Sequence, residues 1–189
     1  MVRILSASVI IALMLSAPLF SSDNGFISLC IGGSAADVKA AIASGADVNE
    51  KDDSGISPLR AAATGNSDPE VVRVLVRAGA SVKERDDSAM TPLMCAAMMN
   101  ENPAVVRALV EAGSDVNAKN GRGETALNSA IMNKRRSEIV TILLDAGADA
   151  SLKNEDGHTA FDEVYGDEEF MKTPECMRLR EESCKNDFT

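Results

Sequence analysis

The sequence predicts an all-α solenoid of stacked helix-turn-helix units joined by short hairpin turns. Two sets of short motifs recur along the chain with the same spacing of 34 residues, which is the pattern of a repeat architecture. Within each repeat, capping residues and glycines mark the ends of two short helices. A single helix pair of this kind leaves one apolar face uncovered, so the pairs are expected to stack on one another.

The two repeated series are plain in the printed sequence. The first begins with a glycine, as in Gly-Ala-Asp-Val-Asn at 45–49, and related segments start at Gly79, Gly113 and Gly147. The second consists of Ser57-Pro58-Leu59, Thr91-Pro92-Leu93, Thr125-Ala126-Leu127 and Thr159-Ala160-Phe161. Two independent series that keep one period over five units are not a chance similarity.

Residues 1–22 have the layout of a secretory signal peptide. After one early basic residue, an apolar run extends over Ile4–Leu15 and is followed by small residues. The run is shorter than the roughly 20 apolar residues that span a membrane, although an uncleaved anchor is the alternative. Because Pro18 blocks cleavage immediately before it, we expect the cut near Ser21 or Ser22. The mature protein is therefore expected to be periplasmic or secreted.

The first helix of each unit is expected to begin after a hydroxyl side chain that accepts a hydrogen bond from a free backbone N–H. Where proline occupies the first helical position, its missing N–H costs nothing. Ser34 and Asp37 are expected to form a capping box in the first unit. The expected N-caps of the later units are Ser57, Thr91, Thr125 and Thr159.

The second helix of a unit is expected to begin at Asp68-Pro69 and again at Asn102-Pro103, and to end at the glycine of the first series. Its apolar residues should face the neighbouring units. We expect the equivalent leucines to be buried in the stack, namely Leu75, Leu109 and Leu143.

The repeats divide the chain into segments of near-equal length. The expected order is signal peptide 1–22, degenerate N-terminal capping repeat 23–53, three full repeats at 54–87, 88–121 and 122–155, and a degenerate C-terminal capping repeat with a tail at 156–189. The last segment lacks an apolar second helix, since only Cys176, Met177 and Leu179 follow Thr173-Pro174. A polar outer face is what a terminal cap requires.

The segment from Ser57-Pro58-Leu59 to Gly79-Ala80-Ser81-Val82 resembles the ankyrin repeat, as do the copies that start at Thr91 and Thr125. The resemblance covers roughly residues 25–165. It implies an ankyrin-repeat solenoid that binds other proteins through its hairpin tips and inner helices, with no enzymatic activity and no cofactor.

Two departures from the family pattern affect the repeats themselves. The period is 34 residues rather than 33, and the additional residue falls near Asn66-Ser67-Asp68. The histidine that usually follows Thr-Pro-Leu is replaced in each repeat. The replacements are Arg60, Met94, Asn128 and Asp162. We expect them to remove a hydrogen bond to the capping hydroxyl and to weaken the repeats.

Composition and charge exclude several classes of function. The chain has 29 acidic and 19 basic residues, a net charge of −10, which argues against binding to nucleic acids and to anionic lipid surfaces. A single histidine nearly excludes a histidine-based catalytic triad or a multi-histidine metal site. That residue, His158, is expected to be a solvated loop residue.

The cysteines are expected to differ in their state. Cys30 and Cys95 lie two repeats apart, too far for a disulfide, and are expected to be buried thiols. Cys176 and Cys184 can pair only if the helix that carries Cys176 ends before Cys184, and both outcomes stay open.

A protein-binding site is expected on the concave surface of the middle repeats, centred on Met90 and Met98. Methionine surfaces adapt to partners, although these side chains can equally fill gaps in a core with few aromatic residues. The residue before each capping hydroxyl, such as Ile56, is placed at a hairpin tip. The full set expected to bind is Asp53, Ile56, Asp87, Met90, Met98, Met99, Arg122, Glu124 and Met132.

Acidic residues are expected to surround this centre. Asp53, Asp87 and Glu124 are expected on successive hairpin tips and would attract a basic partner, although acidic residues are often only a solvated face. The expected function is a non-catalytic scaffold for protein–protein interaction (an adaptor, inhibitor or chaperone-like binder) that acts outside the cytoplasm as a monomer, without a membrane span after signal cleavage. The alternative is a structural module that assembles with itself.

Overall fold

A computed structural model describes residues 25–131, 133, 136–164 and 167–184. Four helix pairs follow one another in the chain: α2 (Gly25–Gly32) and α3 (Ala35–Ala43), α4 (Pro58–Gly65) and α5 (Pro69–Arg77), α6 (Pro92–Met99) and α7 (Pro103–Glu111), α8 (Ala126–Ile131) and α9 (Arg136–Asp145). The last unit has two 3₁₀ turns, η1 (Asp162–Val164) and η2 (Phe170–Lys172), and the helix α10 (Pro174–Ser183). Within the described residues there is no strand, which confirms the all-α solenoid.

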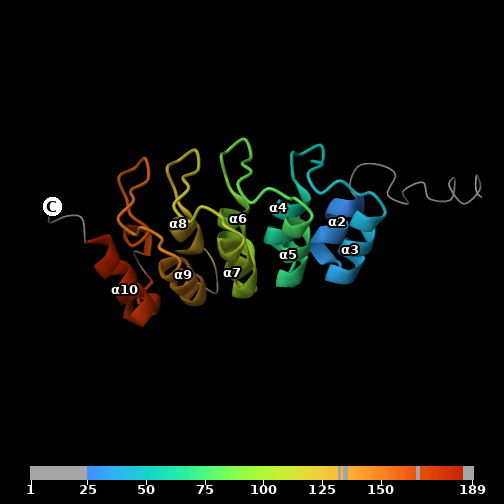
Figure 1. The fold of residues 1–189 in the computed structure, drawn as a ribbon. Helices are drawn as coiled ribbons and strands as arrows, with labels where there is room; N and C mark the ends of the chain where they lie inside the picture. Colours follow the sequence, from blue (N-terminus) through green and yellow to red (C-terminus); the bar gives the residue numbers. More distant parts are fainter. Residues whose placement is uncertain (1–24, 132, 134–135, 165–166, 185–189) are drawn as a thin grey trace, which may run out of the picture.

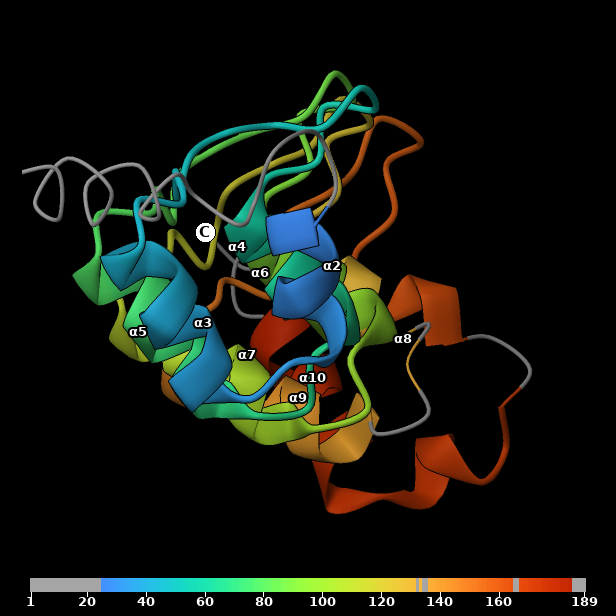
Figure 2. The same ribbon diagram turned by 90° about the vertical axis from the view of Figure 1, so that its right-hand side faces the viewer.

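The helices form two layers that run the length of the stack (Figure 1). Helices α2, α4, α6 and α8 lie side by side in an inner layer, and α3, α5, α7, α9 and α10 lie side by side in an outer layer. The turns between units rise together from one edge, as the view along the stack shows (Figure 2). In this view, the side of the inner layer that faces away from the outer helices forms one surface with the hairpins. We refer to this surface as the inner face.

The helices begin and end where the sequence predicts. Ser34 and Asp37 form a capping box, with the Asp37 N–H donating to Ser34 Oγ at 3.2 Å. Ser57 and Thr91 accept hydrogen bonds from the backbone N–H groups three residues later. The glycines of the first series, 45, 79, 113 and 147, all have positive φ angles between 86° and 101°. Each unit therefore carries its own start and stop signals.

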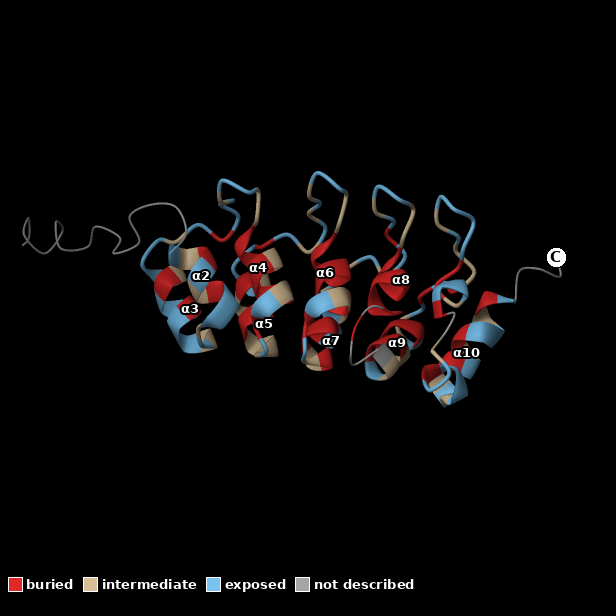
Figure 3. Cartoon of the chain, turned by 180° about the vertical axis from the view of Figure 1, so that it is seen from behind, coloured by how far each residue is buried: buried red, intermediate tan, exposed pale blue. Residues whose placement is uncertain are grey.

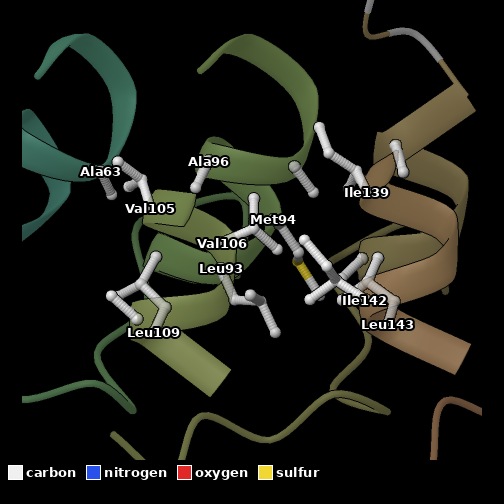
Figure 4. Packing of buried hydrophobic residues seen from close by; sticks show 14 of the residues in the cluster. Ala63, Leu93, Met94, Ala96, Val105, Val106, Leu109, Ile139, Ile142 and Leu143 are labelled. Carbon is white, nitrogen blue, oxygen red and sulfur yellow. The ribbon is translucent and has the colours of Figure 1, made fainter. Parts of the chain in front are cut away.

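The core extends continuously through the stack. Leu75, Leu109 and Leu143 are each 0% exposed, which confirms the predicted burial of the second-helix leucines. Figure 4 shows Leu109 among apolar side chains from neighbouring helices. Colouring by burial shows the inner helices α4, α6 and α8 almost entirely enclosed, while α2 at the end of the stack is partly exposed, as are the hairpins and the outward sides of the outer helices (Figure 3). Every unit is thus stabilised mainly by its neighbours.

A row of buried asparagines links the units, and the sequence analysis did not identify it. Asn66, Asn100 and Asn133 are each 5% exposed or less and follow the inner helices of successive units. Asn100 Nδ2 donates to the carbonyls of Ala63 and Asn66, both at 2.9 Å, and Asn100 Oδ1 accepts from the Asn102 N–H at 2.9 Å. The same amide pattern joins Asn66 to the unit before it. We call these three residues the asparagine ladder.

The expectation that the histidine replacements remove the bond to the capping hydroxyl is wrong in two units. Asn128 Oδ1 accepts from both the N–H and the hydroxyl of Thr125, each at 2.9 Å. Asp162 Oδ2 accepts from the N–H and the hydroxyl of Thr159, each at 2.8 Å. A short amide or carboxylate side chain at this position reaches the cap, so the two C-terminal repeats keep the interaction with different chemistry.

All four cysteines lie in the described residues, and all four are thiols. Cys30 and Cys95 are buried in inner helices, as expected, and burial raises the pKa of Cys30 to about 12. Helix α10 runs to Ser183, with Cys184 as its C-cap. Cys176 is buried and Cys184 is exposed, so these two residues face different environments and are not bonded to each other.

Candidate protein-binding face

One polar side chain organises each hairpin of the inner face. The Oδ1 atoms of Asp52, Asp86, Asn120 and Asn154 each accept hydrogen bonds from the backbone N–H groups two and four residues later, at 2.8–3.1 Å. Such Asx turns set the shape of a loop without further packing. The four hairpins therefore have the same form even though their other residues differ.

This geometry corrects the expected position of four residues. Ile56, Met90, Glu124 and His158 do not occupy the tips, because their carbonyl groups accept hydrogen bonds from the backbone of the Asx residue and close the hairpin at its base. The tips are formed by the residues in between, among them Asp53, Asp87 and Arg122, all of them exposed. The expected acidic tips are therefore present at Asp53 and Asp87, whereas Glu124 and the apolar residues lie closer to the helices.

The last three hairpins are joined to one another. The Gly121 N–H donates to the Ser88 carbonyl at 2.8 Å, and the Glu155 N–H donates to the Arg122 carbonyl at 2.9 Å. Below the tips, the Arg85 guanidinium donates to the Lys119 carbonyl at 2.6 Å, and Lys119 Nζ donates to the Lys153 carbonyl at 2.9 Å. These bonds make the hairpins a connected row rather than independent loops.

The four methionines of the third unit have different roles. Met94 is 1% exposed and belongs to the core, whereas Met99 is 48% exposed. Met90 and Met98 are half-buried. Met90 also packs against the core, and its Sδ accepts a hydrogen bond from Asn120 Nδ2 at 3.3 Å. Met94 and part of Met90 therefore fill the core, whereas Met99 contributes to an exposed apolar surface.

Ile56 and Met90, both placed in the expected binding site, also contribute to folding. Both are half-buried and pack against the core, because the closing position of the hairpin points down onto the inner helices. Met132, the equivalent of Met98 in the following repeat, lies outside the described residues.

Ile31 extends the exposed apolar surface, and sequence reasoning missed it. It is 47% exposed at the end of α2, in a position like that of Met99 at the end of α6. Gly65 ends the helix between them, and a Cβ atom there would lie 2.7 Å from Cγ2 of Ile31, so Ile31 leans against the Gly65 backbone. We call Ile31, Met98 and Met99 the apolar strip. Its signal in the sequence is that Ile31 and Met99 lie two repeat periods apart, at the ends of the inner helices α2 and α6.

Charged groups at the hairpins are not all equally available. Asp86 pairs with Arg60 at 3.1 Å, and Glu84 accepts a hydrogen bond from the Ser57 hydroxyl, so these carboxylates already have partners. Glu124 is half-buried, and its Oε2 atom accepts from Asn120 Nδ2 at 2.7 Å. Glu124 is thus held in place within the predicted site by an amide and not by a cation.

Glu163 stands near Glu124 and was not among the predicted site residues. It lies within η1 in the last unit, and its Oε1 atom accepts from Asn154 Nδ2 at 3.0 Å. Partial burial raises the pKa of Glu163, and the negative charge of Glu124 raises it further. The nearby Asp162 behaves oppositely, because hydrogen bonds from Thr159 lower its pKa.

A second concavity lies on the outer layer. It is a groove of about 420 Å³ between α3 and α5, lined by small and aliphatic residues such as Ala36, Ile42 and Val74, with Lys39 and Arg77 at its edge. Arg77 is already paired with Glu70 at 2.8 Å. The lining residues belong to α3, α5 and Ala78 and include none of the hairpin residues, so this groove does not belong to the predicted site.

Within the part of the chain that the structure describes, no three histidine, cysteine or acidic side chains come together as a metal site. The described helices are also too short or too polar for any of them to cross a membrane.

Comparison with known proteins bears on the family and not on the partner. A family model for ankyrin repeats in three copies matches residues 27–120 and 70–154. No curated protein matches the chain. Proteins built from these repeats are generally protein-interaction modules and are typically not enzymes. Since the matched residues span most of the chain and coincide with the stacked helix pairs, this protein belongs to the ankyrin-repeat family.

Proposed function

We propose that this protein is an exported, non-catalytic scaffold that holds a partner protein against the inner face of its repeats. The observation that carries the proposal is the apolar strip, where Ile31 and Met99 are 47% and 48% exposed at equivalent helix ends. Large apolar side chains left exposed at matching helix ends of an otherwise acidic protein support an interaction site. Adaptor, inhibitor and chaperone-like roles all use such a surface.

The hairpin row supports the same proposal. Backbone bonds between the last three hairpins hold the tips of successive repeats in line, so a partner meets a preformed surface and loses little entropy in ordering it. The exposed carboxylates of Asp53 and Asp87 add negative charge at the hairpin end of the inner face and favour a partner with a basic surface. Export rests on residues 1–22, which lie outside the described residues.

The test is affinity capture from the protein's own cell envelope with matched variants. Met99→Asp places a charge in the apolar strip, and Met177→Asp places the same charge on α10, where Met177 is 52% exposed. Both changes are at exposed side chains, so both proteins should fold. Proteins whose recovery falls at least tenfold with Met99→Asp and not with Met177→Asp are partners of the strip.

The proposed function fails if every captured protein responds equally to the two substitutions. A sizing column run on the same preparations separates the alternative of self-assembly, which would give a mass well above one chain that Met99→Asp reduces. Mass spectrometry of the exported protein tests the signal peptide, because a chain that still begins at Met1 contradicts cleavage.

A further inference from the structure

Helix α10 turns one side toward the C-terminal end of the stack. It is the last helix of the outer layer and packs against α9 and η2 (Figure 1). Its residues Cys176 and Leu179 are buried, and Arg178 pairs with Asp145 of α9 at 2.6 Å. These contacts fix the rotation of α10 about its own axis, so its remaining face points away from α9.

The face that points away from α9 carries four exposed residues. They are Met177, Arg180, Glu181 and Cys184, and their spacing of three and four residues places them on one side of the helix. We call these four residues the α10 stripe, and together they line a hollow of about 400 Å³. Because a terminal unit needs a polar outer face to remain in solution, a methionine that is 52% exposed favours an occupant for the stripe.

The two central residues of the α10 stripe carry opposite charges. Arg180 and Glu181 are adjacent in the chain and so do not face each other on the helix. Among the described residues neither of them forms an ion pair, whereas Arg178 is already held by Asp145. The middle of the stripe thus offers one cation and one anion, with a sulfur-containing side chain at each end. Such an arrangement is complementary to a second copy of itself.

An antiparallel arrangement of two α10 helices brings these groups together. With a twofold axis at the middle of the stripe, each Arg180 lies opposite Glu181 of the second copy. Met177 lies opposite Cys184 of the second copy, so soft, apolar side chains meet at both ends. A parallel pairing in the same register would instead place like charges opposite each other. The antiparallel pairing therefore forms two ion pairs and covers both methionines.

We propose that two copies of this protein associate through their α10 stripes as an antiparallel dimer with twofold symmetry. The stripe contains no residue of the inner face, so pairing leaves both apolar strips accessible. One helix stripe is smaller than the interfaces of roughly 1,200–2,000 Å² in stable complexes, so the dimer dissociates readily. The dimer replaces the monomer that the sequence led us to expect, and it stands independently of the proposed function.

Sedimentation equilibrium of the purified protein over a range of concentrations measures the dimer directly. Arg180→Glu and Glu181→Arg each bring like charges together twice, so each should raise the dimer Kd at least tenfold. The double variant exchanges the two charges and should return the Kd close to the parent value. Arg107→Glu makes the same change at an exposed residue of α7 and should leave the Kd unchanged. A parent protein that remains monomeric up to its solubility limit, or a double variant no better than the single ones, would overturn the proposal.

The register of the two helices is tested separately by oxidation. In the antiparallel pairing the Cys184 residues of the two copies are offset along the axis by about 10 Å, which is beyond the reach of a disulfide. Met177→Cys places a thiol opposite Cys184 of the second copy, so diamide, which takes up the two hydrogens, should then give a covalent dimer. Met171→Cys introduces a thiol at a similarly exposed residue outside the stripe and should not increase cross-linking. Rapid cross-linking of the parent, or equal cross-linking of the two variants, would contradict the antiparallel register.

Met99→Asp separates the dimer from the scaffold. The α10 stripe and the apolar strip share no residue, so Met99→Asp should leave the dimer Kd unchanged. If self-association instead falls with Met99→Asp and not with Arg180→Glu, the copies assemble through the apolar strip and the α10 dimer is wrong. If capture of a different protein depends on Arg180 while this protein stays monomeric, the stripe belongs to that partner and the proposal fails. The response of captured proteins to Met99→Asp decides the scaffold separately in every case.

Discussion

The third unit of the stack, which contains α6 and α7, and the C-terminal unit follow the same sequence pattern but fold differently. In the third repeat both helices are regular, and α6 and α7 are covered by units on either side. In the C-terminal unit the Thr159 cap is present, but the residues after it form only the short turn η1, and α10 supplies the outer helix after η2. A capping signal starts a helix, but the helix continues only where a neighbour buries it.

The largest expected difference between the two regions is in the cost of removing a buried leucine. Leu109→Ala should destabilise the protein by about 2–5 kcal/mol and give a two-step melt, because it uncouples the two halves of the stack. Leu179 is also 0% exposed, but the terminal unit has one neighbour. Leu179→Ala should therefore make only the terminal unit unfold at a lower urea concentration. Urea unfolding followed by circular dichroism distinguishes them. Equal, single transitions would show that the ends and the middle are equally coupled.

The second comparison concerns the asparagine ladder, which joins the middle units and stops at Asn133. Asn100→Ala leaves two carbonyls and one N–H without their buried partner and should cost about 1–3 kcal/mol. The control is Asn49→Ala, because Asn49 is exposed and donates to the Gly79 carbonyl at 3.3 Å. We expect the control to change stability by less than about 0.5 kcal/mol. A similar loss of stability in both variants would show that the buried asparagine ladder contributes no more than an exposed hydrogen bond.

A third, smaller effect compares the hairpins of the same two regions. The second hairpin has Ala89 at a φ of 59°, where the other three have glycine, including Gly157 at 82°. Ala89→Gly should stabilise the protein by about 0.5–1 kcal/mol, since relief of the left-handed strain outweighs the added flexibility of the unfolded chain. Gly157→Ala should instead destabilise the protein. Thermal unfolding of the two variants tests this, and a shift of both in one direction contradicts it.

The smallest expected effect is confined to the C-terminal unit and depends on pH. Since the pKa of Glu163 is raised in the folded protein, its contribution to stability is fully present below the ordinary glutamate pKa of about 4.3 and is lost as the pH rises through the folded value. Glu163→Gln should therefore be more stable than the parent at pH 7, by less than about 0.5 kcal/mol because the group is partly exposed, and equally stable at pH 3. Melting temperatures at the two pH values measure this. If the parent protein is more stable than Glu163→Gln at pH 7, the predicted direction of the effect is wrong.

Most of the fold follows from local signals in particular residues. Ser34, Ser57 and Thr91 cap helices as predicted, because a cap requires only a hydroxyl and the N–H groups of the next turn. Leu109 was placed correctly because the 34-residue period relates it directly to Leu75 and Leu143. The binding residues were harder to place. Met90, Met94, Met98 and Met99 lie within ten residues of one another, and nothing local separates the buried one from the exposed one.

The sequence by itself determined the repeat length, the helix ends, the order of the units and the acidic character of the protein, since each depends on interactions within one turn or one period. Only the tertiary structure decided that Ile31 joins the apolar strip and that Asn66, Asn100 and Asn133 bridge units. It also brought Glu163 to Glu124. These arrangements depend on side chains of neighbouring units that lie more than 30 residues apart in the chain, so they exist only after stacking has placed one unit against the next.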